Sequence, residues 1–182
     1  MAHETAVLGG GCFWCTEAIF QRVRGIKSVV PGYAGGQVEN PTYRAVCNGD
    51  TGHAEVVQID FDPEVISFKD ILEIFWHIHD PTSVNRQGND IGTQYRSIIL
   101  YSSDKQRIVA EKSLKEMDES GNFNRSIVTE IVQLVQFYEA EEYHLDYFAN
   151  NKNQPYCRAI ISPKIKHFMA DNSEKLKKEY LK

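Results

Sequence analysis

Apolar and polar residues follow two different periods in neighbouring segments of the chain. Residues 54–63 (AEVVQIDFDP) alternate with the period of two that is typical of a half-buried strand. Residues 67–80 (SFKDILEIFWHIHD) show the period of an amphipathic helix, with Ser67 as its N-cap. The apolar face predicted for that helix consists of Ile71, Leu72, Phe75 and Ile78. Strands and helices are therefore both expected.

The same patterns predict the remaining elements. Further strands are expected over residues 5–11, 26–36 with an interruption at Pro31, 97–102 and 128–138. Further helices are expected over residues 12–23, 103–119 with Ser102 or Ser103 as N-cap, 140–150 and 164–181. Two long polar connections, 37–53 and 81–96, remain, and loops of that length in a compact domain usually carry function.

This order of elements predicts an α+β fold. We expect a two-layer sandwich in which helices cover one side of a mixed β-sheet, with a ferredoxin-like core and flanking segments wrapped around it. A chain of 182 residues is long enough for one domain with a proper core and short for two. Residues 1–182 are therefore expected to form a single catalytic domain.

Composition and charge exclude some classes of function. The hydrophobic fraction of 42% and the charged fraction of 25% are ordinary for a globular protein. The net charge of −5 argues against nucleic acid as a partner, because it does not neutralise a phosphate backbone. No apolar stretch reaches the length of a membrane span, and the first residues do not resemble a signal peptide. We expect a cytoplasmic protein without a membrane partner.

Four cysteines, at positions 12, 15, 47 and 157, are the main chemical signal. In the cytoplasm such thiols are more often catalytic or metal-binding than paired in structural disulfides. The C-x-x-C pair at 12 and 15 is consistent with a metal clip, a dithiol redox pair or one reactive thiol with a helper. A structural zinc site would usually need a second close pair of Cys or His ligands, and none is present. We therefore do not expect a structural zinc site.

Cys12 follows three glycines and precedes a predicted helix. The unpaired N–H groups at a helix N-terminus stabilise an anion, so we expect a lowered pKa and an attacking thiol. The alternative is a buried cysteine that behaves as a small hydrophobe. Cys15 lies three positions later, with its Cβ about 5–6 Å away on the same helix face, which suits a transient disulfide.

Phe13 and Trp14 lie between the two thiols. They are suited to forming an apolar wall beside a reactive sulfur, although packing in the core is the simpler interpretation of such a pair. Thioredoxin-like proteins share the C-x-x-C spacing, so a thioredoxin-like disulfide oxidoreductase is the rival hypothesis. Those proteins, however, typically place tryptophan before the first cysteine.

The two polar connections and the strand between them contain further candidates. Glu55 begins an apolar strand, where loss of water would raise its pKa and make it a proton donor near neutrality. Tyr43, Tyr95 and Asp90 come from glycine- and proline-rich surroundings, and a phenol can donate a hydrogen bond to a polarised oxygen. His53 is better interpreted as a hydrogen-bonded structural histidine.

Several motifs occur together in one order. They are GGGCFWCTE, GYAGG, NPTY, GDTGHAEVVQIDFDP and DPTSVNRQGNDIGTQYRS, followed by AEEYHLDY and NQPYC. This set resembles the peptide methionine sulfoxide reductases of the A type, in the variant that has cysteine after FW. The first five motifs cover roughly residues 7–101, and the combination is far more specific than any single one.

The resemblance implies reduction of methionine S-sulfoxide, free or in proteins, without a cofactor, by a peptide-methionine (S)-S-oxide reductase that repairs oxidised proteins. It assigns Cys12 as the nucleophile and Phe13 and Trp14 as the pocket for the S-methyl group. It assigns Glu55 to the sulfoxide oxygen. In the same site, the resemblance makes Tyr43 and Tyr95 helpers of this carboxyl and lets Asp90 shape the pocket.

The resemblance further implies that Cys12 becomes a sulfenic acid, condenses with a second thiol and is restored by thioredoxin. Many relatives have glycine in place of Cys15 and resolve with cysteines in a C-terminal tail. Here Cys15 is the first choice for the resolving thiol, and Cys157 is the second or a relay. We interpret Cys47 as structural. A non-catalytic metal- or redox-sensing module remains a further alternative.

Overall fold

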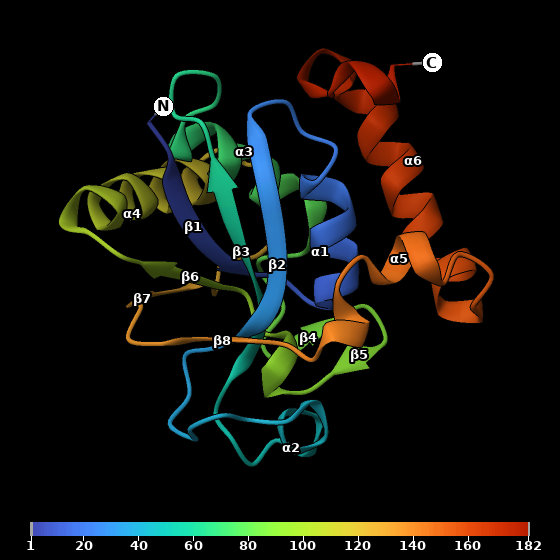
Figure 1. Ribbon diagram of the computed structural model, residues 1–182. Helices are drawn as coiled ribbons and strands as arrows, with labels where there is room; N and C mark the ends of the chain where they lie inside the picture. The colour runs from blue at the N-terminus through green and yellow to red at the C-terminus, as the bar shows by residue number, and fades with distance from the viewer. Residues whose placement is uncertain (1, 182) are drawn as a thin grey trace.

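The computed structural model describes residues 2–181 and centres on a six-stranded mixed sheet (Figure 1). The strands lie in the order β7 (Glu130–Gln133), β6 (Ile98–Tyr101), β1 (Glu4–Gly9), β3 (Ala54–Phe61), β2 (Ile26–Ala34) and β8 (Phe137–Glu139). All neighbours are antiparallel except β6 and β7, which run parallel. A separate two-stranded hairpin consists of β4 (Arg86–Gln87) and β5 (Asp90–Ile91).

Six α-helices accompany the strands. They are α1 (Phe13–Phe20), α2 (Tyr43–Asn48), α3 (Phe68–Ile78), α4 (Asp104–Glu119), α5 (Tyr147–Asn150) and α6 (Ser162–Asp171). Short 3₁₀ turns occur at Thr93–Tyr95, Glu142–His144, Ser173–Lys175 and Lys178–Tyr180, and one π-helical turn occurs at Cys157–Ile161. The predicted caps of α3 and α4 are confirmed, since Ser67 and Ser103 each accept a hydrogen bond from the backbone three residues later.

The predicted α+β sandwich with a ferredoxin-like core is confirmed. The segment from β1 to β6 runs β1-α1-β2-β3-α3-β6, and its four strands lie in the order β6-β1-β3-β2. This is the split β-α-β arrangement, in which each helix returns the chain across the same face of the sheet. It places the N-terminus of α1, and with it the C-x-x-C pair, at the end of the central strand β1.

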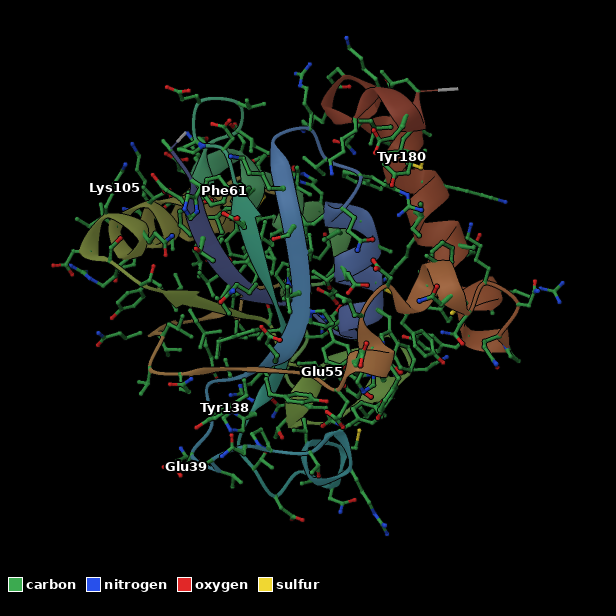
Figure 2. The ribbon with its side chains drawn as sticks, viewed as in Figure 1. Glu39, Glu55, Phe61, Lys105, Tyr138 and Tyr180 are labelled. Carbon is green, nitrogen blue, oxygen red and sulfur yellow. The ribbon has the colours of Figure 1, made fainter. Side chains whose placement is uncertain are left out.

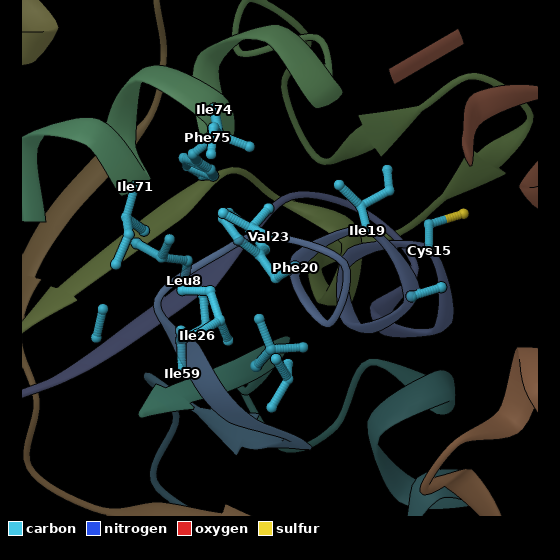
Figure 3. Packing of buried hydrophobic residues seen from close by; sticks show 14 of the residues in the cluster. Leu8, Cys15, Ile19, Phe20, Val23, Ile26, Ile59, Ile71, Ile74 and Phe75 are labelled. Atoms are coloured by element: carbon cyan, nitrogen blue, oxygen red, sulfur yellow. The ribbon is translucent and has the colours of Figure 1, made fainter. Parts of the chain in front are cut away.

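The two faces of the sheet are buried in different ways. Along β1 and β3, Leu8 and Val57 face the helices, whereas Val7 and Val56 face the opposite side, as the strand period of two requires. The helix side forms the main core, which includes Ile19, Phe20 and Phe75 from α1 and α3 (Figure 3). The opposite side has its own smaller apolar core, composed of Val7, Ala34, Ala54, Val56, Ile98 and Leu100, with Val132, Leu134 and Phe137 packed against it.

The single strand predicted over residues 128–138 is wrong, because this segment forms both edges of the sheet. β7 and β8 are opposite edge strands, separated by only residues 134–136. Five strand spacings in a flat sheet would place them about 24 Å apart. Four residue steps of extended chain reach only about 14 Å. The sheet must therefore curl until its edges approach each other, and the curl encloses the smaller core (Figure 1).

The predicted interruption at Pro31 is also wrong, since β2 continues through it. The carbonyl of Pro31 accepts a hydrogen bond from the N–H of Ala140, just past the end of β8. A strand residue directs its N–H and C=O to the same side, so the missing donor of Pro31 faces the end of β8 and not β3. The central pairing of β2 with β3 therefore loses nothing.

The C-terminal part differs from the prediction in its boundaries. In place of one helix over 164–181, α6 begins at Ser162 directly after the π-helical turn and ends at Asp171, and short 3₁₀ turns follow. Figure 1 shows α5 and α6 beside α1, on the side of α1 away from α4. This part of the chain packs against α1.

Candidate active site

Three glycines determine how Cys12 is presented. A Cβ on Gly10 would lie 2.9 Å from the ring of His79, so only glycine allows this approach of the backbone. Gly11 has φ +95°, in the left-handed region that favours glycine. The chain then enters α1 with Cys12 as the N-cap residue in extended conformation, without a side-chain hydrogen bond of its own. The run of glycines thus holds the sulfur of Cys12 at the helix start.

The expected lowering of the Cys12 pKa is wrong. Burial of the sulfur raises the pKa well above its ordinary value, and the neighbouring Glu55 and Cys15 raise it further. The N–H of Trp14 favours the thiolate, as the helix N-terminus argument requires, but the loss of water outweighs it. Cys12 is therefore a neutral thiol in the resting protein.

Glu55 supplies a buried acid beside Cys12. Only 1% of its surface is exposed, at the second position of β3 (Figure 2). Its Oε1 accepts the N–H of Phe13 at 3.2 Å, and its Oε2 has no hydrogen-bond partner among the described residues. Burial raises its pKa to about 8 against the weaker opposing effect of that N–H, which confirms the direction predicted. Glu55 is thus protonated at neutral pH, with one oxygen free to bind another group.

Phe13 and Trp14 have unequal positions. Phe13 is 1% exposed, whereas Trp14 is half-buried. The ring of Phe13 lies 6.3 Å from Tyr43 and 5.0 Å from His144. Trp14 stacks on Tyr147 with ring centroids 3.7 Å apart and an interplanar angle of 8°. These rings form an aromatic cluster next to the Cys12–Glu55 pair.

The three polar candidates from the loops lie near this cluster. Tyr43 begins α2, and Tyr95 ends the 3₁₀ turn after β5. Burial and the nearby Glu55 raise the pKa of both phenols, so both remain hydrogen-bond donors. Asp90, in β5, accepts a 2.6 Å hydrogen bond from the hydroxyl of Tyr156. Its negative charge also raises the pKa of Glu55.

His144, Tyr147 and Tyr156 join the site without having been singled out from the sequence. The indole Nε1 of Trp14 donates to Nδ1 of His144 at 2.9 Å, which places the histidine proton on Nε2. Burial lowers the pKa of His144, so the ring is neutral. All three residues lie in the motifs AEEYHLDY and NQPYC. Their spacing in the chain, however, gives no sign that they contact residue 14.

Glu141 holds the loop helix in place. Its Oε1 accepts a 2.9 Å hydrogen bond from the hydroxyl of Tyr33 on β2, and its Oε2 accepts a 3.0 Å bond from the N–H of Tyr43. These bonds favour the carboxylate, so the pKa of Glu141 is lowered despite partial burial.

His53, as predicted, is a structural residue: its Nδ1 accepts the N–H of Gly36 at 3.0 Å, and its Nε2 donates to the carbonyl of Val38 at 2.7 Å.

The four cysteines form no disulfide with one another and differ in exposure. Cys15 is 6% exposed on α1, and Cys157 is fully buried in the π-helical turn. Figure 3 shows the sulfur of Cys15 at the edge of the main core, pointing away from the other labelled side chains. Cys47 is exposed near the end of α2, so the structure gives no support to the interpretation of Cys47 as structural.

Two further observations concern metals and membranes. Within residues 2–181, no group of three or more His, Cys, Asp or Glu side chains is arranged to hold a metal ion. Over the same part of the chain, every helix is too short or too polar to cross a membrane.

Known proteins match this chain in sequence and in structure. The family model for peptide methionine sulfoxide reductase matches residues 4–177. The peptide methionine sulfoxide reductase MsrA of Sulfolobus acidocaldarius is 57% identical over 172 residues, which is 94% of this chain and 97% of that protein. Reduced Mxr1 from Saccharomyces cerevisiae superposes with a TM-score of 0.74 at 36% identity, covering 85% of this chain and 89% of its own. Mxr1 in complex with Trx2 matches at a TM-score of 0.52 and 26% identity, covering 80% and 84%. The chain belongs to the peptide methionine sulfoxide reductase family.

Proposed function

We propose that this protein reduces the S epimer of methionine sulfoxide, free or within proteins, and is recycled by thioredoxin. The observation that carries the proposal is the pair of neutral groups at the start of α1. A buried acid with a pKa of about 8 and an unpaired oxygen lies beside a neutral, partly exposed thiol, next to an aromatic cluster. Membership of the family and the complex of Mxr1 with thioredoxin Trx2 support the assignment of substrate and reductant.

The first step uses Cys12 and Glu55. Glu55 donates its proton to the sulfoxide oxygen, which makes the sulfur more electrophilic, and Cys12 attacks that sulfur. The thiol proton of Cys12 replaces the proton on Glu55. Oxygen transfer then leaves Cys12 as a sulfenic acid and releases methionine, so that one thiol and one sulfoxide become one sulfenic acid and one thioether.

The remaining site residues position the substrate. Phe13 and Trp14 hold the S-methyl group, and the hydrogen bond from Trp14 to His144 fixes the orientation of the indole. Tyr43 and Tyr95 donate hydrogen bonds to the oxygen as it gains charge. Asp90, bonded to Tyr156, shapes the open side of the pocket.

Cys15 is the resolving thiol in this proposal. It attacks the sulfenic acid of Cys12, and the Cys12–Cys15 disulfide forms with release of water. Support comes from the position of Cys15 in the first turn of the helix for which Cys12 is the N-cap residue. Cys157 is buried close enough to Cys15 to raise its pKa and is the second choice, or a relay.

The proposal treats residues 1–182 as one catalytic domain in the cytoplasm. The curled sheet and the C-terminal segment that packs against α1 support a single folding unit. A thioredoxin partner suits a reducing compartment.

The decisive experiment measures turnover of separated sulfoxide epimers with dithiothreitol as reductant. We expect reduction of the S epimer alone, loss of activity in Cys12→Ser, and retained activity in the control Cys47→Ser. Activity in Cys12→Ser, or equal use of both epimers, would overturn the mechanism. A protein that reduces disulfides instead would support the thioredoxin-like alternative, although burial raises the pKa of both thiols of the pair.

A second experiment identifies the resolving thiol. After one turnover without reductant, peptide mapping should find the Cys12–Cys15 disulfide in the wild type and in Cys157→Ser. Cys15→Ser should leave a trappable sulfenic acid on Cys12. A Cys12–Cys157 bond in the wild type would reverse the assignment.

A further inference from the structure

A large groove opens on the side of α1 that faces α3 and α6. It has a volume of about 1350 Å³, and both Cys12 and Cys15 lie in its wall. Phe13, Trp14 and Glu55, which belong to the proposed substrate pocket, are not among its lining residues. Asp90 and Tyr156, which border the same pocket, do line the groove, so the groove reaches the two thiols beside that pocket.

The charges along this groove largely neutralise one another. Within the lining, Arg125 lies 3.7 Å from Asp80, and the acidic residues Glu73, Asp90 and Asp171 are offset by Lys164 and Lys175. Lys164, on α6, has no ion-pair partner within residues 2–181 and is half-buried among the lining residues. Lys164 is therefore a free cation in the same groove as the two thiols.

Apolar side chains complete the groove. Ile160 is 37% exposed at its rim, and Phe123 and Phe168 line it further in. An apolar surface with a locally neutral, polar rim is the composition of a protein-binding patch. It does not have the concentrated charge that would select a small anion.

We propose that this groove, which we call the α1–α6 groove, is where a protein dithiol of the thioredoxin type docks on the oxidised enzyme, and that Lys164 favours departure of Cys15 as a thiolate. The inference rests on the proposed function and extends it to the reductive half of the cycle. Asp90 and Tyr156 border both the groove and the proposed substrate pocket, whereas the methyl-binding rings of Phe13 and Trp14 lie outside the groove.

The chemistry follows from the different surroundings of the two sulfurs. The reductant thiolate attacks Sγ of Cys12, a new S–S bond forms there, and the Cys12–Cys15 bond breaks with its electron pair on Cys15. The second thiol of the reductant then attacks the mixed disulfide and releases Cys12, while the Cys15 thiolate takes up a proton. The reductant leaves as a disulfide, and the enzyme regains both thiols.

Two observations favour attack at Cys12 over attack at Cys15. Cys12 is partly exposed, whereas Cys15 is 6% exposed. The better leaving group is the thiol with the lower pKa, and among the charged groups around Cys15 only Lys164 lowers its pKa. Asp90, Cys157 and Glu55 all raise it, and burial brings it to about 11.

The test separates the two half-reactions. Enzyme without reductant should form one methionine per active site in a burst, which tests the proposed function alone. The rate at which thioredoxin then reduces the oxidised enzyme tests the groove. Lys164→Met should leave the burst unchanged. It should slow the reduction by thioredoxin about three- to tenfold, because the leaving thiol, Cys15, becomes more basic without the lysine charge.

Matched variants distinguish charge from structure. Lys164→Arg should restore the thioredoxin step, and Lys166→Met, on the exposed side of the same helix, should match the wild type. Ile160→Lys should raise the KM for thioredoxin, whereas Ile108→Lys, at a 57% exposed isoleucine on α4, should not. A thioredoxin that retains only its attacking cysteine should be trapped in a disulfide with Cys12.

Four results would overturn the inference. They are a trapped bond to Cys15 or Cys157, equal slowing of burst and reduction in Lys164→Met, no rescue by arginine, and an effect of Ile160→Lys on the KM of a sulfoxide peptide in place of thioredoxin. A missing burst in the wild type would instead contradict the proposed function itself.

Discussion

Cys12 and Glu55 both hold their protons at neutral pH, and burial is the main cause for each. A thiolate beside a carboxylate would repel it in a site that excludes water. Two neutral groups avoid that repulsion and still contain the proton that the sulfoxide oxygen needs. The proposed acid, Glu55, and the proposed nucleophile, Cys12, therefore react only when a substrate is bound. Its oxygen then accepts the proton of Glu55, and its sulfur is attacked by Cys12.

Glu55→Gln tests this arrangement through the pH dependence of the burst. Glutamine can still accept the N–H of Phe13 but has no acidic proton, so we expect the single-turnover rate to fall by about 10²–10⁴. In the wild type the rate should decline as pH rises through about 8, where Glu55 ionises. Methionine formation measured against pH checks both statements, and a wild-type rate that is flat across that range would contradict them.

The same carboxyl links stability to pH. Its folded pKa of about 8 is above its ordinary value of 4.5, so the folded state binds more protons than the unfolded state between these values. Stability from this group is full below about 4.5 and is lost as pH rises through about 8. Urea unfolding of wild type and Glu55→Gln should therefore show a growing advantage of the variant with rising pH over this window.

The sequence alone singles out the main side chains of the candidate site but not their electrostatics. Cys12 and Glu55 are recognisable from the glycine turn and from the apolar strand. The pKa of Cys12 is raised and not lowered as expected. The local sequence shows that Cys12 lies at a helix start, but it does not show the packing that removes water from the sulfur. His144 is unpredictable for a similar reason, since its bond to Trp14 spans 130 residues of chain.

At the scale of elements, sequence patterns predict an element well where its formation depends only on neighbouring residues of the chain. α3 was predicted from its period and its cap, and both depend on neighbouring residues. The strand predicted over 128–138 failed because apolar periodicity does not reveal that one segment leaves one edge of the sheet and joins the other. The interruption predicted at Pro31 is wrong for the same reason. The side of β2 that lacks a backbone donor at Pro31 faces the end of β8, and local sequence does not reveal this pairing.

The cap of α3 offers a test at this scale. Ser67 accepts the N–H of Asp70 at 3.1 Å, and the Asp70 carboxylate accepts the N–H of Ser67 at 3.1 Å. Ser67→Ala breaks this reciprocal cap and should lower the free energy of unfolding by about 1 kcal/mol, with sulfoxide turnover unchanged. Urea denaturation measures the loss. Ser103→Ala removes the single cap bond to Gln106 on α4 and should cost no more; a larger loss there would contradict the argument.

For the whole molecule, the curl of the sheet depends on a close approach at Gly32. A Cβ at this position would lie 2.4 Å from the ring of Phe137 and 2.5 Å from the carbonyl oxygen of Tyr138. Gly32→Ala should therefore push β8 away from β2 and lower the free energy of unfolding by about 1–3 kcal/mol. Chemical denaturation measures this loss. Val135→Ala, at a residue that is 91% exposed, is the control and should change it by less than about 0.5 kcal/mol.

The short link between β7 and β8 also has a consequence for proteolysis of the molecule. Both edges of the sheet are tied to each other only through residues 134–136, and Val135 projects into solvent at the centre of that tie. One protease cut there would break the covalent link between the two edges of the sheet, next to the smaller core. β7 would stay paired with β6 and β8 with β2, so we expect the nick to loosen the closure of the sheet without releasing either strand.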